Sequence, residues 1–200
     1  MYGGIMNIFK ALKKEGKFLK RFYISMGTLF VLLPLSVYMT NMYTAFYVIF
    51  LFIIELMIVL AVISKRNATK IRYSCNNNRL KITSGLFSME NLIFCDKVVL
   101  VHTEKMEDDI EIYIFTTVNF KNKRLKLVGK SLLKRIPSVE EDYLKVRRDN
   151  PGRIIYFQQV KRGGLKKYML LDTIYKNCVK AVYTDQCIEN IKIARGQTLV

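Results

Sequence analysis

Histidine is almost absent from this chain, and the closely spaced cysteines of common zinc sites are missing. The sequence has one histidine, His102, and four cysteines at positions 75, 95, 178 and 187, none of which forms a C-x-x-C pair. A zinc site would therefore need all four sulfurs to converge through folding. The chain also lacks the P-loop, G-x-G-x-x-G, G-x-S-x-G and H-E-x-x-H motifs. These absences predict a protein that is not an enzyme and that holds no cofactor and no metal ion.

The two remaining candidates for chemistry are better explained as structure. His102 lies in an alternating run, where we expect a solvated or hydrogen-bonded strand position and not a catalytic base. Glu107, Asp108 and Asp109 form an acidic turn, which could coordinate a divalent cation but is more typical of a solvated loop. An enzyme whose site has no familiar motif stays as an alternative.

Charge is also missing from a long central stretch. Between Arg21 and Lys65 the only side chain that is charged at neutral pH is Glu55. Two apolar runs lie there, at 22–39 and 43–64, and a membrane-crossing helix needs about 20 residues. The sequence predicts a transmembrane helical hairpin over 22–64. A buried helix pair in a soluble domain is the alternative, although such a pair normally shows a polar stripe. No cleavable signal peptide is expected, because no A-x-A site follows the first run.

The positive charge lies on both sides of the hairpin. The formal net charge is +17, and both 1–21 and 65–200 are strongly basic, whereas the loop 40–42 carries no charge. Basic flanks stay on the cytoplasmic side. We therefore expect a multi-pass protein of the cell membrane with both termini in the cytoplasm, and a cytosolic domain at 65–200. The cysteines would then lie in a reducing compartment, where disulfides are rare.

The arm at 1–21 places apolar residues at helical spacing, with lysines largely on the other faces. Ile5, Ile8, Phe9 and Leu12 form the apolar face. This pattern is typical of an amphipathic helix that lies on the anionic membrane surface before the chain turns inward. A basic start that only sets the topology is an equally good interpretation.

Glu55 lies near the centre of the second span. An unpaired charged carboxylate costs at least ~3 kcal/mol there, so the residue needs a partner. We expect Glu55 to mediate helix association within or between chains, with Thr28 or a backbone carbonyl of the first span as a polar contact. A proton or ion relay is disfavoured, because no second charged side chain lies inside the hairpin.

Short β-prone runs follow the second span. The triple Asn76-Asn77-Asn78 tolerates positive φ and predicts a tight hairpin turn. Six strands are expected in an antiparallel meander, over 68–75, 79–84, 86–94, 98–105, 110–118 and 124–129. The fold class is therefore a membrane hairpin followed by a mainly antiparallel α+β domain.

The remaining residues mix helices and strands. Ser138 and Glu141 form a capping-box pattern that predicts a helix through about Arg147. Thr184 is expected to cap a second helix that ends near Gly196. Further expectations are a strand hairpin over 153–160 and 165–171, a helical stripe of Leu170, Leu171, Ile174, Cys178 and Val182, and small core positions for Cys178 and Cys187.

The run RYSCNNNRLKITSGLFSMENLIF, together with two preceding spans and a basic exit, resembles bacterial pleckstrin-homology-like membrane proteins. The resemblance covers roughly residues 22–129 and implies a β-barrel or sandwich closed by a C-terminal helix. It also implies an interaction module without catalytic residues. Residues 130–200 exceed the length that this pattern requires, so the place of the closing helix is not fixed.

Clustered basic residues are the strongest remaining signal. They are Lys121, Lys123 and Arg124, then Lys130, Lys134 and Arg135, and finally Lys161, Arg162, Lys166 and Lys167. On a tethered domain they would contact anionic inner-leaflet lipid or a partner protein. Nucleic-acid binding is disfavoured by the tether, and solvated basic turns are the simplest alternative.

The sequence thus predicts a non-enzymatic, membrane-anchored interaction module, whose cytosolic domain docks a partner protein or the anionic inner leaflet. The alternative is a small accessory subunit of a membrane translocation or transport complex, with Glu55 in a helix interface. Either function is compatible with a homo-oligomer.

Overall fold

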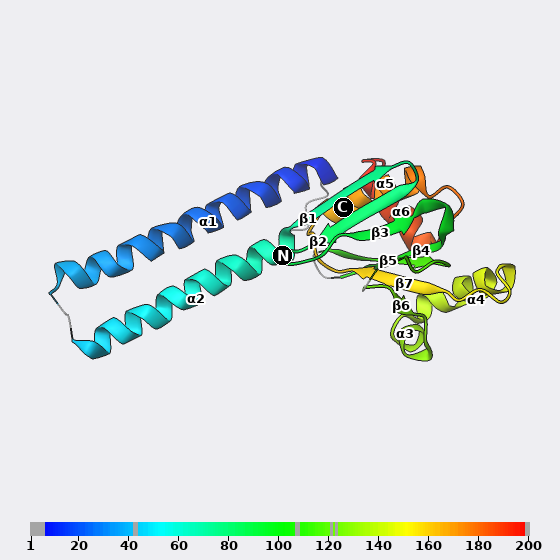
Figure 1. Cartoon of the computed structure of the whole chain (residues 1–200). Coiled ribbons are helices and arrows are strands. Elements are labelled where there is room, and N and C mark those ends of the chain that lie inside the picture. Colours follow the sequence, from blue (N-terminus) through cyan, green and yellow to red (C-terminus); the bar gives the residue numbers. More distant parts are fainter. Residues whose placement is uncertain (1–6, 42–43, 107–108, 121, 123, 199–200) are drawn as a thin grey trace.

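The computed structural model consists of two long apolar helices followed by an α+β domain (Figure 1). The structure describes residues 7–41, 44–106, 109–120, 122 and 124–198. The coarse order predicted from the sequence, a helical hairpin and then an antiparallel-rich domain, is confirmed.

The two helices, α1 (Ile8–Met39) and α2 (Ala45–Thr69), lie side by side as an antiparallel pair (Figure 1). Both are long and apolar enough to cross a membrane, and the most apolar part of each is not buried within the chain. A helix pair at the centre of a soluble domain would be buried, so this exposure agrees better with the expected hairpin.

The expected turn between the arm and the first span is wrong. Helix α1 runs without interruption from Ile8, with Asn7 as its N-cap, and the Asn7 carboxamide oxygen accepts a hydrogen bond from the Phe9 amide at 3.1 Å. The side chains of Ile8 and Ala11 are buried, and Ile8 belongs to the core of the β-rich domain. An apolar helical stripe can cover lipid or protein equally well, and here it covers protein. Ile5 lies outside the described residues.

The strands form two sheets. The first has the order β1-β2-β3, with bounds Ile71–Asn76, Arg79–Ser84 and Asn91–Phe94. The second has the order β6-β7-β5-β4-β8, with bounds Lys126–Leu127, Tyr156–Val160, Ile110–Thr116, Val98–Lys105 and Val182–Tyr183. All pairs are antiparallel except β4 with β8.

All six predicted strands are present, but the continuous meander is wrong at two points. After β3 the short 3-10 turn Cys95–Lys97 carries the chain into the second sheet. Strand β6 does not pair with β5 as a meander would require. Strand β7 pairs with that edge of β5 over a longer stretch, and β6 pairs with the other edge of β7. The predicted turn between β1 and β2 is confirmed, since Asn77 and Asn78 both have positive φ, 49° and 59°.

The second half of the domain is mostly helical. Its helices are α3 (Lys130–Arg135), α4 (Glu140–Asp149), α5 (Lys166–Asn177) and α6 (Asp185–Ala194), and a 3-10 turn, Pro137–Val139, precedes α4. The strand predicted over 165–171 is wrong, because α5 begins at Lys166 with Leu165 as its N-cap. Tyr168, Leu171 and Ile174 share one buried helical face there, and that tertiary burial outweighs the local alternation.

The predicted caps differ in outcome. Thr184 caps α6 as expected and accepts a hydrogen bond from the Cys187 amide at 3.4 Å. Gly196 follows the helix with φ 71°, which agrees with the predicted end. Ser138 does not cap α4, because its hydroxyl lies 3.4 Å from the Nε2 of His102.

The second sheet separates two apolar clusters. One cluster lies between this sheet, the first sheet and helices α5 and α6, and it contains Ile8 and the predicted core residues Cys178 and Cys187. Val182, which was expected on the same helical stripe, is exposed in β8. The other cluster lies against α3 and α4, around Phe115. The sheet is thus covered on both faces.

Candidate functional site

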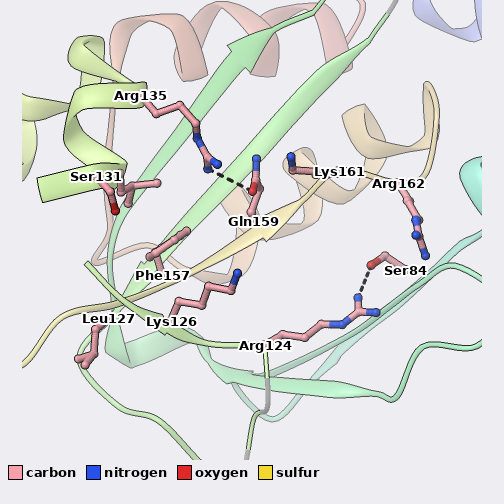
Figure 2. A pocket seen from close by; sticks show the side chains of 11 residues that line it. Ser84, Arg124, Lys126, Leu127, Ser131, Arg135, Phe157, Gln159, Lys161 and Arg162 are labelled. Atoms are coloured by element: carbon pink, nitrogen blue, oxygen red, sulfur yellow. Dashed lines mark hydrogen bonds between the residues drawn. The ribbon is translucent and has the colours of Figure 1, made fainter. Parts of the chain in front are cut away.

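A cleft of about 550 Å³ opens between β2, β7 and α3 (Figure 2). Its lining consists of Ser84, Arg124, Lys126, Leu127, Ser131, Leu132, Arg135, Phe157, Gln159, Lys161 and Arg162. Every ionisable side chain in this described lining is a cation. We name it the cationic cleft.

The cations come from segments that are far apart in the sequence. Arg124 and Lys126 lie at or just before β6, Arg135 ends α3, and Lys161 and Arg162 follow the last residue of β7. Strand β7 brings them together, because it pairs with β6 along one edge and runs toward α2 at its end. At least one member of each predicted basic cluster therefore reaches the same cleft.

Two of the guanidinium groups are held by neutral acceptors. Arg124 donates from Nη1 to the Ser84 hydroxyl at 2.8 Å, and Arg135 donates from Nη2 to Oε1 of Gln159 at 3.3 Å (Figure 2). A neutral acceptor fixes the position of an arginine without neutralising its charge. Both groups keep further N–H donors that can bind an anion.

A carboxylate lies behind the wall of the cleft. Gln159 donates from Nε2 to the carboxylate of Glu111 and to the Tyr113 hydroxyl, which itself donates to Glu111 at 2.7 Å. Burial and the adjacent carboxylate raise the pKa of Tyr113 well above its ordinary value, so its hydroxyl stays protonated. The Lys161 Nζ is 3.9 Å from Glu111, which offsets one of the five positive charges.

One end of the cleft lies beside the end of α2. Arg162 donates to the side-chain oxygen of Asn67 at 3.2 Å, and the amide of Gly163 donates to the carbonyl of Ala68 at 2.8 Å. Arg162 thus lies next to the first polar turn beyond the apolar run of α2. The cleft extends from this point along β7 toward Gln159 and α3.

Several predicted contact residues are not in the cleft. Lys130 and Lys134 are exposed on α3 but do not line it. Lys166 lines a separate cavity beside Leu12 and Glu15. The contacts predicted for Lys121 and Lys123 fall outside the described residues.

Lys167 requires a correction. Its side chain is only 1 % exposed, and Nζ lies 2.7 Å from the Asp109 carboxylate and donates to the Lys161 carbonyl at 2.7 Å. A buried ammonium that is paired in this way cannot contact lipid. The predicted lipid contact of Lys167 is wrong because this residue lies on the buried face of α5, whereas the neighbouring Lys166 lies on the exposed face. Asp109 is half-buried and pairs with this buried lysine, and Glu107 and Asp108 lie outside the described residues.

Sequence reasoning missed the polar residues that build the cleft. Lys126, Gln159 and Ser84 line it, and Glu111 supports it from behind. The polar pair Gln158-Gln159 inside an otherwise apolar strand was the available signal, because a central strand that is covered on both faces normally carries apolar residues.

His102 is a structural residue, in agreement with the predicted hydrogen-bonded strand position. Its ring is buried, with Nδ1 3.0 Å from the Thr184 hydroxyl oxygen and Nε2 near Ser138. Burial lowers the pKa of His102 to about 4, so the imidazole is neutral at physiological pH.

The cysteines are free thiols in the domain core. The sulfur atoms of Cys75 and Cys95 are 3.6 Å apart, and burial raises the pKa of Cys75 to about 11. Such thiols are poor nucleophiles at neutral pH. Within the part of the chain that the structure describes, no three histidine, cysteine or acidic side chains are placed to hold a metal ion.

The expected contact between Glu55 and Thr28 is not formed. The Thr28 hydroxyl instead donates to the carbonyl of Ile24 at 3.0 Å, within its own helix. Glu55 is half-buried on α2, and its side chain makes no hydrogen bond or ion pair with any described residue.

Comparisons with known proteins give no relative from which a function could be transferred. No family model, curated protein or solved structure matches the chain. The function is therefore argued from the cleft and the helices.

Proposed function

We propose that this chain is a two-span membrane protein of the cell membrane, whose cytosolic domain binds the anionic, phosphate-bearing headgroups of the inner leaflet in the cationic cleft. The observation that carries the proposal is the convergence of Arg124, Arg135 and Arg162 on one cleft whose described lining contains no acid. Arginine forks match the geometry of phosphate oxygens.

The membrane part of the proposal rests on α1 and α2. Two helices of sufficient length and apolar character lie side by side without being buried in the chain. Both sequence segments that flank them are basic, which favours a cytoplasmic location for the two termini and for the domain.

The shape of the cleft favours a small anionic group over nucleic acid. A volume of about 550 Å³ is typical of a small-molecule site. Single-stranded nucleic acid would need exposed aromatic rings among the lining cations for stacking, but Phe157, the aromatic residue of the described lining, is buried. Leu127 and Leu132 give the cleft an apolar flank, which suits the first methylene groups of the acyl chains of a lipid.

We retain the pleckstrin-homology-like fold as part of the proposal. Two packed sheets, the Asn77-Asn78 turn and the closing helix α6 against β4 support it. Helices α3, α4 and α5, which are inserted between the strands, make the second half more elaborate than that pattern requires.

The experiment uses the full chain, because Ile8 completes the core of the domain and a fragment spanning 65–200 would lack it. Protein held in a neutral detergent is titrated with short-chain phosphatidic acid or phosphatidylcholine, and binding is measured by calorimetry. We expect the anionic lipid to bind, with an affinity that falls as salt rises, and the neutral lipid not to bind. Equal binding of both lipids would refute the proposal.

A matched pair of variants assigns the binding to the cleft. Arg124→Gln with Arg135→Gln removes two charges that line it, whereas Lys130→Gln with Lys134→Gln removes two exposed charges that do not. We expect the first pair to weaken binding at least about tenfold, or about 1.4 kcal/mol, and the second pair to have little effect.

A third arm separates the sources of phosphate. Glycerol phosphate, which has no acyl chains, should compete only weakly with the lipid. Competition as strong as that of the lipid itself would assign the cleft to a soluble phosphorylated ligand.

A second candidate function is supported by Glu55. This residue is half-buried on α2, near the middle of the apolar run, and its side chain has no polar partner among the described residues. A carboxyl group in hydrocarbon is stabilised when it hydrogen-bonds to a neighbouring helix. The chain would then be an accessory subunit of a larger membrane complex, or a homo-oligomer, with Glu55 in the helix interface.

A further inference from the structure

The segment between β2 and β3 carries two large apolar side chains that nothing in the described chain covers. Phe87 is 86 % exposed and Met89 is 72 % exposed. Neither residue lines the cationic cleft. Isolated exposed apolar residues are ordinary, but two in one short segment need an explanation from their position.

This segment is attached directly to the end of α2. The amide of Leu86 donates to the side-chain oxygen of Asn67 at 2.9 Å, and the amide of Gly85 donates to the carbonyl of Lys70 at 2.7 Å. Gly85 has φ +100°, and a Cβ there would lie 2.6 Å from the Asn67 oxygen. Only glycine permits this approach, so the chain brings the segment against the helix.

The attachment fixes the depth of the segment. Asn67 lies three residues beyond Ser64, where the apolar run of α2 ends, which is about 4.5 Å along the helix axis. The headgroup layer on each side of a bilayer is about 5–7 Å thick. The backbone of Leu86 is therefore at headgroup depth, and the Phe87 ring is within reach of the hydrocarbon boundary.

We propose that the segment 85–90 inserts Phe87 and Met89 into the interfacial layer of the bilayer that α2 leaves. The bilayer is the occupant because the hydrogen bonds from the Gly85 and Leu86 amides to α2 hold the backbone of this segment beside the end of the apolar run. The insertion would give the domain a third attachment beside its two helices and would keep Arg162, which shares the Asn67 oxygen, at the headgroups. The inference rests on the proposed membrane insertion of α1 and α2, but it does not require a ligand in the cleft.

The chain contains no tryptophan, so a single substitution gives an unambiguous fluorescent reporter. Three full-length variants are compared in nanodiscs of neutral phosphatidylcholine, without bromine or with bromine on the acyl chains, placed near the headgroup to reach position 87 and near the bilayer centre to reach position 52. Phe87→Trp tests the segment, and Phe52→Trp reports on the exposed face of α2. Val179→Trp is the matched control. Val179 is 78 % exposed and precedes β8. Strand β8 pairs near the start of β4, and this end of the sheet lies away from α2.

We expect the brominated lipid to quench the fluorescence of Phe87→Trp and Phe52→Trp at least about twofold and to leave Val179→Trp unchanged. Quenching of Phe52→Trp without quenching of Phe87→Trp would overturn the insertion of the segment and leave the membrane helices intact. No quenching of Phe52→Trp would overturn the membrane proposal and this inference together. Equal quenching of Phe87→Trp and Val179→Trp would also overturn the insertion, because the segment would then have no special depth.

Discussion

Replacing Ile8 with alanine tests whether the N-terminal arm is part of the domain core. Ile8 is fully buried, and it packs in the cluster that also contains the second sheet and helices α5 and α6. An interfacial helix on the membrane surface would leave the stability of the domain independent of this side chain.

The size of the effect follows from burial. Isoleucine-to-alanine changes in cores cost about 2–5 kcal/mol. Ile8 lies in the first turn of α1, where the helix end can move partly into the cavity, so we expect about 2–3 kcal/mol. For a chain of this size that loss lowers the thermal midpoint by roughly 4–12 °C.

The buried thiols provide the assay. Cys95, Cys178 and Cys187 are buried in the same cluster as Ile8, so a thiol-reactive dye reports on the unfolding of the domain in detergent. The matched control is Phe9→Ala, since Phe9 is the next residue along the helix and is 56 % exposed. We expect Ile8→Ala to have a much lower midpoint than Phe9→Ala. Equal midpoints for the two variants would refute the docking of the arm.

Two further predictions concern other parts of the chain. His102 has a pKa of about 4 when folded and an ordinary value near 6.5 when unfolded, so its neutral, buried ring favours the fold above pH 6.5 and this contribution is lost as pH falls toward 4. At about pH 5 the lost contribution to the free energy of unfolding is roughly 2 kcal/mol. The variant His102→Gln should therefore flatten the dependence of the thermal midpoint on pH between about 7.5 and 5. An unchanged slope would contradict the assignment of this pH dependence to His102. Glu55→Leu should abolish the co-purification of a membrane partner or of a second, tagged copy, whereas Phe52→Leu on the exposed face of α2 should not. An identical set of bound proteins for Glu55→Leu would count against a helix interface.

The strands were predictable because their signal is local. Alternation in β1 and β2, and the two asparagines with positive φ between them, need only neighbouring residues. The pairing of β6 with β7 could not be predicted, since it depends on which strand occupies the edge of β5. The segment 165–171 fits a strand or a helix by its local pattern, and only its burial in the domain core decides for the helix.

The sequence alone determined the apolar hairpin, the uneven placement of charge and the lack of known catalytic motifs, because these are properties of composition and spacing. Tertiary structure decided what the charged and apolar residues face. It buried Lys167 beside Asp109, drew Ile8 into the core, and gathered cations from three separate segments into one cleft. The physical reason is that a side chain's surroundings depend on contacts between residues far apart in the chain, and the order of the amino acids shows only which neighbours are near.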